Sequence, residues 1–362
     1  MDSNAILDIF NSNAFSVTEL SMAMDLIPVQ WGRLGELNVF PEESVFTTSV
    51  AIEYRNNQLY LLPSRPRGGP ASVGGVGRRG ALPFNLLHLP HEDAVSADEI
   101  QNVRGFGLPV QMETAMNVVN RKLLTMRNKH DITLEHLRAG AAQGIIYDSD
   151  GATVLLNLFT AFGVAQPNVY FDWVGNTYNV VHLCNQIKRW IQDKLMGDTL
   201  DHIRAICAPD FFDNMLQNPT VLKAYQLYTA RVEGGNPISD DFTMTKANRA
   251  FPFGGIMWEE YRAYAGLEAP DGTVTTQQFL PAGTCRFLPM GTKFTMKTFF
   301  GPGTFLETVN APGLKFYAKM APEKFNRRWD IYTESNPLPI CTKPLLLIQG
   351  NTGTGVGTVG LT

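Results

Sequence analysis

The longest periodic pattern in the chain runs from residue 110 to residue 142. Apolar side chains recur there every three or four positions, which places them on one face of an α-helix. The row contains Met112, Met116, Val119, Leu123, Met126, His130, Leu134 and Leu137. At about 1.5 Å per residue, this helix is roughly 45–50 Å long. Because the opposite face is not strongly charged, we expect the helix to lie across a sheet and not in a coiled coil.

Two shorter patterns indicate β-hairpins. Residues 49–55 alternate apolar and polar side chains, and the two asparagines after them fit a tight turn that returns through residues 59–62. Residues 145–147 and 153–156 flank an Asp-Ser-Asp-Gly turn and predict a second hairpin. Since an isolated hairpin is marginally stable in water, we expect the first one to lie on a neighbour.

Helices and strands occupy different parts of the remaining sequence. Capping boxes at 16–19 and 96–99 predict two short helices. Further helices are predicted at 178–196, 199–206, 209–217 and 219–230. From residue 251 onward, short apolar runs predict strands at 255–258, 273–277, 284–288, 294–299, 314–319, 329–333 and 345–348. Because the two kinds of element are segregated along the chain, the predicted class is α+β.

A glycine-rich segment at residues 75–80 has the spacing of a dinucleotide-binding signature, and a second copy occupies residues 355–360. That signature requires a strand before it and a helix that begins inside it. No strand pattern precedes the first copy, and Pro83 stops a helix after it. We interpret both copies as flexible segments, and we expect residues 63–90 to form a long irregular arm.

Composition favours a protein that buries much of its surface against other chains. Hydrophobic residues make up 44% of the 362 residues and charged residues 18%, below the ~25% typical of soluble proteins. The alternative is a large enzyme with an unusually apolar surface. The net charge of −4 includes no basic excess, so tight wrapping by nucleic acid is not expected.

Little in the sequence indicates catalysis or metal binding. The four cysteines, Cys184, Cys207, Cys285 and Cys341, form no CxxC pair and predict buried free thiols. The histidines lack ligand spacing, and the GxSxG, Walker A and HExxH motifs do not occur. We therefore expect no metal and no cofactor. The first residues lack a signal-peptide pattern, and no apolar run reaches the ~20 residues of a membrane span, so we expect synthesis in a cytoplasm and no membrane partner.

Four arginines of the expected arm, Arg65, Arg67, Arg78 and Arg79, have two interpretations. They could bind phosphate, or they could pair with carboxylates of a neighbouring subunit. The aromatic side chains of a nucleic-acid platform are not interleaved with them, and a planar guanidinium group suits interface ion pairs. We therefore predict intersubunit contacts for these four side chains.

Several segments, in the same order along the chain, resemble a known family. They are the runs at 26–28, 63–68, 253–256, 260–262, 279–286, 307–310, 317–319 and 334–341. The last run reads ESNPLPIC, and the run at 279–286 reads FLPAGTCR. Together they resemble the major capsid protein E family of tailed bacteriophages, the lambda-type capsid proteins, over most of residues 5–350.

The resemblance implies the Hong Kong 97 phage-type major capsid fold, which is an α+β fold. Residues 1–45 would form its N-terminal arm, and residues 46–95 its extended loop, a β-hairpin with a mobile tip. The peripheral domain would comprise 96–164 and 256–319 with the spine helix at 110–142, and the axial domain would comprise 165–255 and 320–350. The glycine-rich tail at 351–362 would lie outside the resemblance.

The resemblance also implies a structural protein and not an enzyme. Its copies would assemble as pentamers and hexamers into an icosahedral head that encloses double-stranded DNA, after synthesis in the host cytoplasm. The implied partners are further copies, a portal, a separate scaffolding protein, a decoration protein, and DNA contacted without sequence specificity. A scaffolding segment within the chain is not expected, because the helix and strand pattern begins by residue 16. Two alternatives stay open: a bacterial nanocompartment shell of the same fold, and a cytoplasmic enzyme with a nucleotide site at 75–80.

Overall fold

The chain divides into two compact units that each combine several stretches of sequence. The computed structural model describes residues 21, 24, 32–55, 79–101, 111–173, 175, 179–233, 250–268, 274–353 and 360–361. Unit 1 comprises Met1–Val50, Asn85–Ala139 and Lys297–Ile340, and unit 2 comprises Ala51–Phe84, Gly140–Met296 and Cys341–Thr362.

The boundaries of these units differ from the domain boundaries expected from the sequence. Residues 320–340 belong with the long helix, and residues 256–296 belong to the other unit. The reason is strand pairing, because β16 (Arg328–Ser335) bonds along its whole length to β4 (Leu89–Ser96) in unit 1. The names peripheral and axial domain therefore stay predictions.

The predicted long helix is confirmed as α5, Gln111–Gln143. From Val119 onward, the apolar row that predicted it is buried, with Val119, Leu123 and Met126 each at most 2% exposed. The helix stops at Gly144, whose φ of 84° lies in the left-handed region. A Cβ at Gly144 would also overlap the Phe159 ring, so glycine serves both as terminator and as a point of close packing.

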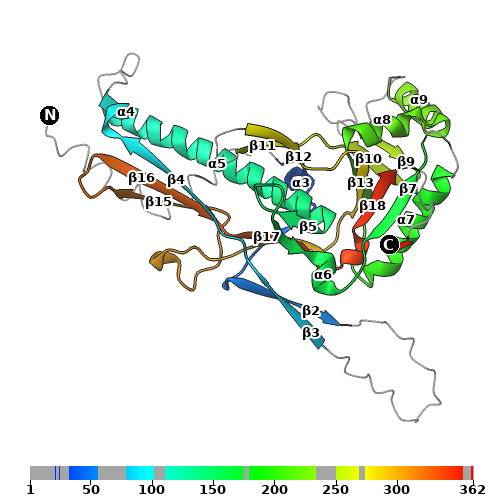
Figure 1. Cartoon of the computed structure of the whole chain (residues 1–362), viewed down its shortest axis with the longest axis horizontal. Helices are drawn as coiled ribbons and strands as arrows, with labels where there is room; N and C mark the ends of the chain where they lie inside the picture. Colours follow the sequence, from blue (N-terminus) through cyan, green and yellow to red (C-terminus); the bar gives the residue numbers. More distant parts are fainter. Residues whose placement is uncertain are drawn as a thin grey trace, which may run out of the picture. The chain divides into compact units, whose positions relative to one another are not determined.

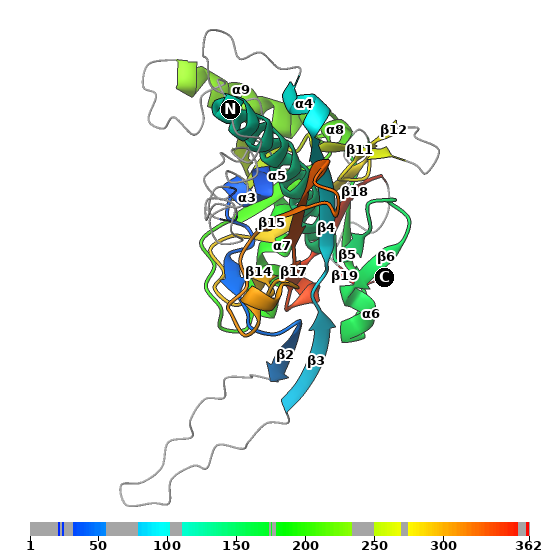
Figure 2. The same ribbon diagram turned by 90° about the vertical axis from the view of Figure 1, so that its left-hand side faces the viewer.

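α5 packs on a three-stranded antiparallel sheet of order β15-β16-β4, in which β15 spans Tyr317–Pro322 (Figures 1 and 2). A continuous apolar cluster joins the helix to this sheet. Its members are Met24, Val95, Val118, Val119, Leu123, Met126, Phe316, Ala318, Met320, Trp329 and Ile331. This arrangement confirms the prediction of a helix laid across a sheet.

The other elements of unit 1 are short. They are α3 (Arg33–Glu36), β1 (Glu42–Ser44), α4 (Ala97–Gln101), β14 (Met296–Phe300), the 3-10 turn η2 (Leu306–Thr308) and β17 (Pro337–Cys341). β1, β14 and β17 form a second three-stranded sheet. The predicted capping box is present before α4, where the Glu99 main-chain N–H donates to Ser96 Oγ over 3.3 Å. The helix predicted after residues 16–19 lies almost entirely outside the described residues.

Unit 2 is built on a seven-stranded mixed sheet of order β19-β7-β18-β13-β8-β10-β9. These strands are β7 (Pro167–Phe171), β8 (Ile203–Cys207), β9 (Ala250–Phe253), β10 (Ile256–Glu260), β13 (Thr284–Pro289), β18 (Ile348–Thr352) and β19 (Gly360–Leu361). Aromatic rings pack at its centre: Trp258 lies 5.4 Å from Phe287 and 5.9 Å from Phe171, both edge-on. The helix predicted at 199–206 is wrong, because β8 is a strand whose two faces are both buried and therefore shows no alternation.

Four α-helices accompany this sheet: α6 (Leu158–Phe162), α7 (Val180–Leu195), α8 (Pro209–Gln217) and α9 (Pro219–Glu233). The last three confirm the helices predicted at 178–196, 209–217 and 219–230. α7 begins where the Asn179 side chain accepts hydrogen bonds from the main-chain N–H groups of Val181 and His182, which is the favoured N-cap arrangement. The strand predicted at 345–348 is instead the 3-10 turn η3 (Pro344–Leu346), followed by β18.

Among the described residues, unit 2 also has three two-stranded sheets: β5 (Ile145–Tyr147) with β6 (Val154–Asn157), β11 (Tyr264–Glu268) with β12 (Val274–Gln278), and β2 (Ser49–Arg55) with β3 (Arg79–Asn85). The first confirms a predicted hairpin. The partner of β2 is β3 (Figure 1), which corrects the expected pairing with residues 59–62; those residues lie outside the described part. β3 and β4 are strands, which corrects the irregular arm expected up to residue 90. β19, within the expected glycine-rich tail, pairs with β7 in the seven-stranded sheet.

Candidate functional site

The four arginines singled out in the sequence are largely beyond what the structure describes. Arg65, Arg67 and Arg78 lie outside the described residues, and Arg79 is the first residue of β3. Their predicted intersubunit contacts therefore stay a prediction. The last two residues of the nucleotide signature at 75–80 begin the strand β3 and not a helix, whereas a pyrophosphate site of this kind requires a helix N-terminus; residues 75–78 lie outside the described residues.

The titratable side chains of the described residues take part in separate local contacts and do not gather at one site that could hold a metal ion. Among those residues, no three histidine, cysteine or carboxylate side chains are grouped so that they could hold a metal ion. All four cysteines are buried free thiols, as predicted, and burial raises the pKa of Cys184 and of Cys341 to about 12. No helix in the described part of the chain is both long and apolar enough to span a membrane.

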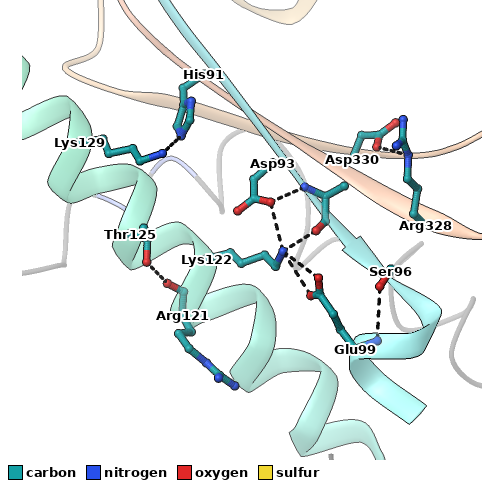
Figure 3. Close-up of polar contacts among 11 residues, drawn as sticks. His91, Asp93, Ser96, Glu99, Arg121, Lys122, Thr125, Lys129, Arg328 and Asp330 are labelled. Atoms are coloured by element: carbon teal, nitrogen blue, oxygen red, sulfur yellow. Dashed lines mark hydrogen bonds and ion pairs between the residues drawn. The ribbon is translucent and has the colours of Figure 1, made fainter. Parts of the chain in front are cut away.

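The densest polar contacts line α5, and they begin at Lys122 (Figure 3). Its ammonium group donates to Asp93 Oδ1 over 3.1 Å and to the Ala94 carbonyl over 2.5 Å, both on β4, and lies 3.2 Å from Glu99 of α4. Partial burial lowers the pKa of Lys122, but the hydrogen bonds to the two carboxylates outweigh it, so this pKa lies above its ordinary value. One lysine thereby ties the helix to both neighbouring elements.

Two turns further along, α5 meets the sheet through histidines. Lys129 Nζ lies 3.2 Å from His91 Nε2, and His130 Nε2 lies 3.0 Å from the Thr333 hydroxyl of β16. His130 is buried. Desolvation, with smaller contributions from His91 and Arg127, lowers the pKa of His130 to about 4. The imidazole is therefore neutral at neutral pH.

Between Lys122 and Lys129, the charged residue Arg127 of the helix binds Met24, near the start of the chain. Its Nε donates to Asp131 over 2.9 Å, and its Nη1 donates to the Met24 carbonyl over 2.7 Å. The guanidinium group also lies 3.8 Å from the centre of the Phe316 ring. Both side chains of the Arg127–Asp131 pair are 3% exposed. Burial raises the pKa of the Asp131 carboxyl more strongly than Arg127 lowers it.

The last turns of the helix repeat this arrangement. The Leu34 main-chain N–H donates to Glu135 over 2.8 Å, and Arg138 donates to Glu42 of β1 over 2.7 Å. Lys315 also reaches Glu42, over 2.6 Å. A cavity of about 220 Å³ lies between these side chains. Arg127, Glu135 and Arg138 thus bind Met24, Leu34 and Glu42 to the helix. The parallel pairing of β1 and β14 is the adjoining main-chain contact.

A loop that connects β14 to β15, residues 301–314, is anchored at several points along its length. The buried Glu334 carboxylate accepts from both the main-chain N–H and the hydroxyl of Thr304, over 2.6 and 2.5 Å. The Thr308 hydroxyl lies 3.0 Å from the Gly303 carbonyl, and the Leu314 N–H donates to the Tyr317 hydroxyl over 2.8 Å. These contacts fix the base of the loop, while its outer residues face solvent.

In unit 2, the buried charges instead connect neighbouring strands. Arg204 of β8 is paired with Glu259 of β10, and Arg286 of β13 donates to the Gln349 side chain of β18 over 2.6 Å. Desolvation lowers the pKa of Arg286 to about 10. A separate cavity of about 260 Å³ is lined mainly by apolar side chains, among them Leu82, Phe162 and Leu345.

Reasoning from the sequence missed the charged face of α5. Arg127, Asp131, Glu135 and Arg138 are spaced by four, four and three residues, which places them along one side of a helix. That spacing could have predicted a charged row along the helix. The expected helix has one apolar row and an opposite face that is not strongly charged. In the structure, these four charged side chains are all buried.

Comparison with known sequences gives consistent results along nearly the whole chain. The family described as phage major capsid protein E matches residues 16–352. The major capsid protein of Pseudomonas phage KPP10 is 28% identical over 344 residues, which cover 93% of this chain and 97% of that protein. The major capsid protein of Salmonella phage Felix O1 is 21% identical over 356 residues, covering 92% and 95%.

Two solved structures share the fold. A prophage protein of Escherichia coli CFT073 that is assigned to the capsid superposes with a TM-score of 0.55 at 12% identity, covering 98% of this chain and 99% of that one. A phage-related protein of Bordetella bronchiseptica RB50 gives a TM-score of 0.50 at 13% identity, covering 94% and 98%. At these identities the likeness concerns the fold alone.

Proposed function

The chain belongs to the phage major capsid protein E family, and from this premise we propose that its copies assemble as pentamers and hexamers into an icosahedral head that encloses double-stranded DNA. Members of this family are structural proteins of the capsid and not enzymes. The fold is α+β and of the Hong Kong 97 phage type. The observation that carries the proposal is the length of the match, which extends over 93% of this chain and 97% of a phage major capsid protein.

The described geometry is compatible with a shell subunit. The 33 residues of α5 span roughly 50 Å at about 1.5 Å per residue, and the helix packs on a sheet from Val118 to His130. A helix braced in this way resists bending. We propose that unit 1, which contains α5, is the peripheral domain and that unit 2 is the axial domain around the centres of pentamers and hexamers.

The proposal extends to location and partners. Chains would be made in the host cytoplasm, and would assemble with a portal and a separate scaffolding protein before DNA enters. The net charge of −4 supports contact with DNA that is weak and independent of sequence. A decoration protein on the outer surface is a further expected partner.

Imaging particles of two variants tests the assembly role of the arm. Deletion of residues 66–80 removes Arg67, Arg78 and Arg79, and replacement of Arg65, Arg67, Arg78 and Arg79 by glutamine removes only their charge. If these arginines pair with carboxylates of a neighbour, both variants should give fewer or less heat-stable particles than the native chain. Electron microscopy of the purified particles measures yield and symmetry, and nuclease protection measures enclosed DNA.

Three outcomes would contradict parts of this proposal. Native, equally stable heads from both variants would exclude the arginine contacts. Particles that contain protein cargo and no protected DNA would favour a nanocompartment shell. A native chain that stays a discrete small species under all conditions of co-expression would overturn the assembly proposal itself.

A further inference from the structure

The 301–314 loop exposes apolar side chains to an unusual degree. Leu306 is 91% exposed and Val309 is 62% exposed. Single exposed apolar residues are common on protein surfaces and by themselves need no explanation. These two lie three positions apart, at either end of the turn that contains η2, so they form one small apolar tip.

The tip is held in place by the base of its own loop. The buried Glu334 carboxylate binds Thr304, and the Thr308 hydroxyl lies 2.9 Å from the Phe305 carbonyl. The Phe305 ring meets the Tyr332 ring edge-on at 5.7 Å. At the other end, a Cβ on Gly313 would overlap the Phe300 carbonyl oxygen, so the main chain there is packed as closely as glycine allows.

The charge next to the tip is already neutralised within one copy. The carboxylate of Glu307, which lies between Leu306 and Thr308, is 2.6 Å from the ammonium group of Lys319 on β15. The charge of Glu307, the neighbour of Leu306, is therefore balanced by Lys319 of the same copy. Two exposed apolar side chains suit an apolar protein partner better than the phosphates of DNA, which are bound by cations.

We propose that Leu306 and Val309 form a docking tip that becomes buried against a second copy of this chain in the assembled shell. The inference rests on the proposed function, because a shell built from one kind of chain presents that chain as the commonest partner surface. Anchors of protein interfaces are apolar side chains that are held in their bound position beforehand, since less conformational entropy is then lost on association. The anchored 301–314 loop meets this requirement.

Substitution at Leu306 tests the energetic side of the proposal. Leu306→Asp places a charge in the buried contact, whereas Leu306→Met keeps an apolar side chain of similar volume. At 91% exposure neither change should alter the unassembled chain, which circular dichroism and its thermal midpoint verify. We expect Leu306→Asp to lower particle yield at least tenfold and Leu306→Met to assemble like the native chain.

Chemical labelling tests the contact itself. In Leu306→Cys, a small thiol reagent should label the unassembled chain rapidly and the particles at least tenfold more slowly. The native chain gives the background, which is low because its four thiols are buried. Equal labelling rates of Leu306→Cys before and after assembly overturn the proposal, whatever the yield of Leu306→Asp. Absence of particles from the native chain overturns the proposed function instead, so the two failures are distinguishable.

Discussion

Both α5 and the seven-stranded sheet contain buried charged side chains, yet these connect different kinds of structure. In unit 2, Arg204 and Glu259 lie on the paired strands β8 and β10, and Arg286 faces Gln349 across β13 and β18. Main-chain hydrogen bonds already hold those strands together. In unit 1, Arg127 and Glu135 bind main-chain groups of Met24 and Leu34, neither of which lies in a strand.

The same chemistry therefore has different consequences in the two units. Loss of a charged group from the sheet leaves its strands paired, and the Trp258 cluster still packs. Loss of a charged group from α5 removes the contact that positions the N-terminal segment on the helix. At Arg127 it also leaves the Asp131 carboxylate buried without its partner, which costs far more than the pair contributes. Three substitutions examine this difference.

Arg127→Met is expected to give the largest effect. Asp131 would be left buried without its partner, and the free energy of unfolding should fall by about 3–5 kcal/mol. Since the pKa of Asp131 is already raised by burial, the loss should be smaller at pH 5, where the carboxyl can take up a proton, than at pH 8. Denaturant unfolding at the two pH values measures both effects.

A matched double variant controls for the loss of the arginine's own packing. Arg127→Met with Asp131→Leu removes both charges, and it should recover most of the lost stability. The residual loss reports the other contacts of Arg127, among them the hydrogen bond to the Met24 carbonyl and the contact with the Phe316 ring. A double variant as unstable as Arg127→Met alone would show that packing and not charge dominates at this position.

The buried His130 predicts a loss of stability in acid. Its pKa is about 4 in the folded chain and 6.5 ordinarily, so between these values the unfolded chain binds more protons. The contribution of His130 to the free energy of unfolding is therefore fully present above about pH 6.5. It falls by about 3 kcal/mol as the pH is lowered toward 4. His130→Gln should remove that component, and the difference between the two unfolding curves against pH isolates it from titrating carboxylates. Parallel curves would contradict the assignment.

Local periodicity explains which elements could be predicted from the sequence. α5, α7 and the β5–β6 hairpin have patterns that depend on neighbouring residues alone. Three of the strands that were not predicted, β4, β9 and β17, each contain proline. All three lie at the edge of a sheet, where a missing N–H is tolerated, but edge positions are set by long-range pairing that the sequence does not display.

The functional surfaces were predictable to a smaller extent. The spacing of Arg127, Asp131, Glu135 and Arg138 showed that these residues share one side of α5. Their partners include the Met24 carbonyl and the Leu34 N–H. Because these partners are main-chain groups, the residue types at these positions do not indicate that they bind a charged side chain. The tip at Leu306 could not be predicted from the sequence either, because its position depends on Glu334, a residue distant in sequence. Only the family resemblance, and no single motif, indicated the capsid function.

Arg286→Met is expected to give the smallest effect of the three. Arg286 is 5% exposed and donates to the neutral Gln349 amide, so its removal leaves no buried charge behind. Replacing a desolvated cation by an apolar side chain of similar length is commonly neutral or stabilising. We therefore expect the free energy of unfolding to change by less than about 1 kcal/mol, with no dependence on pH between 5 and 8. A loss as large as that of Arg127→Met would show that the sheet depends on its buried charges as much as the helix does, and that the contrast between the two units does not hold.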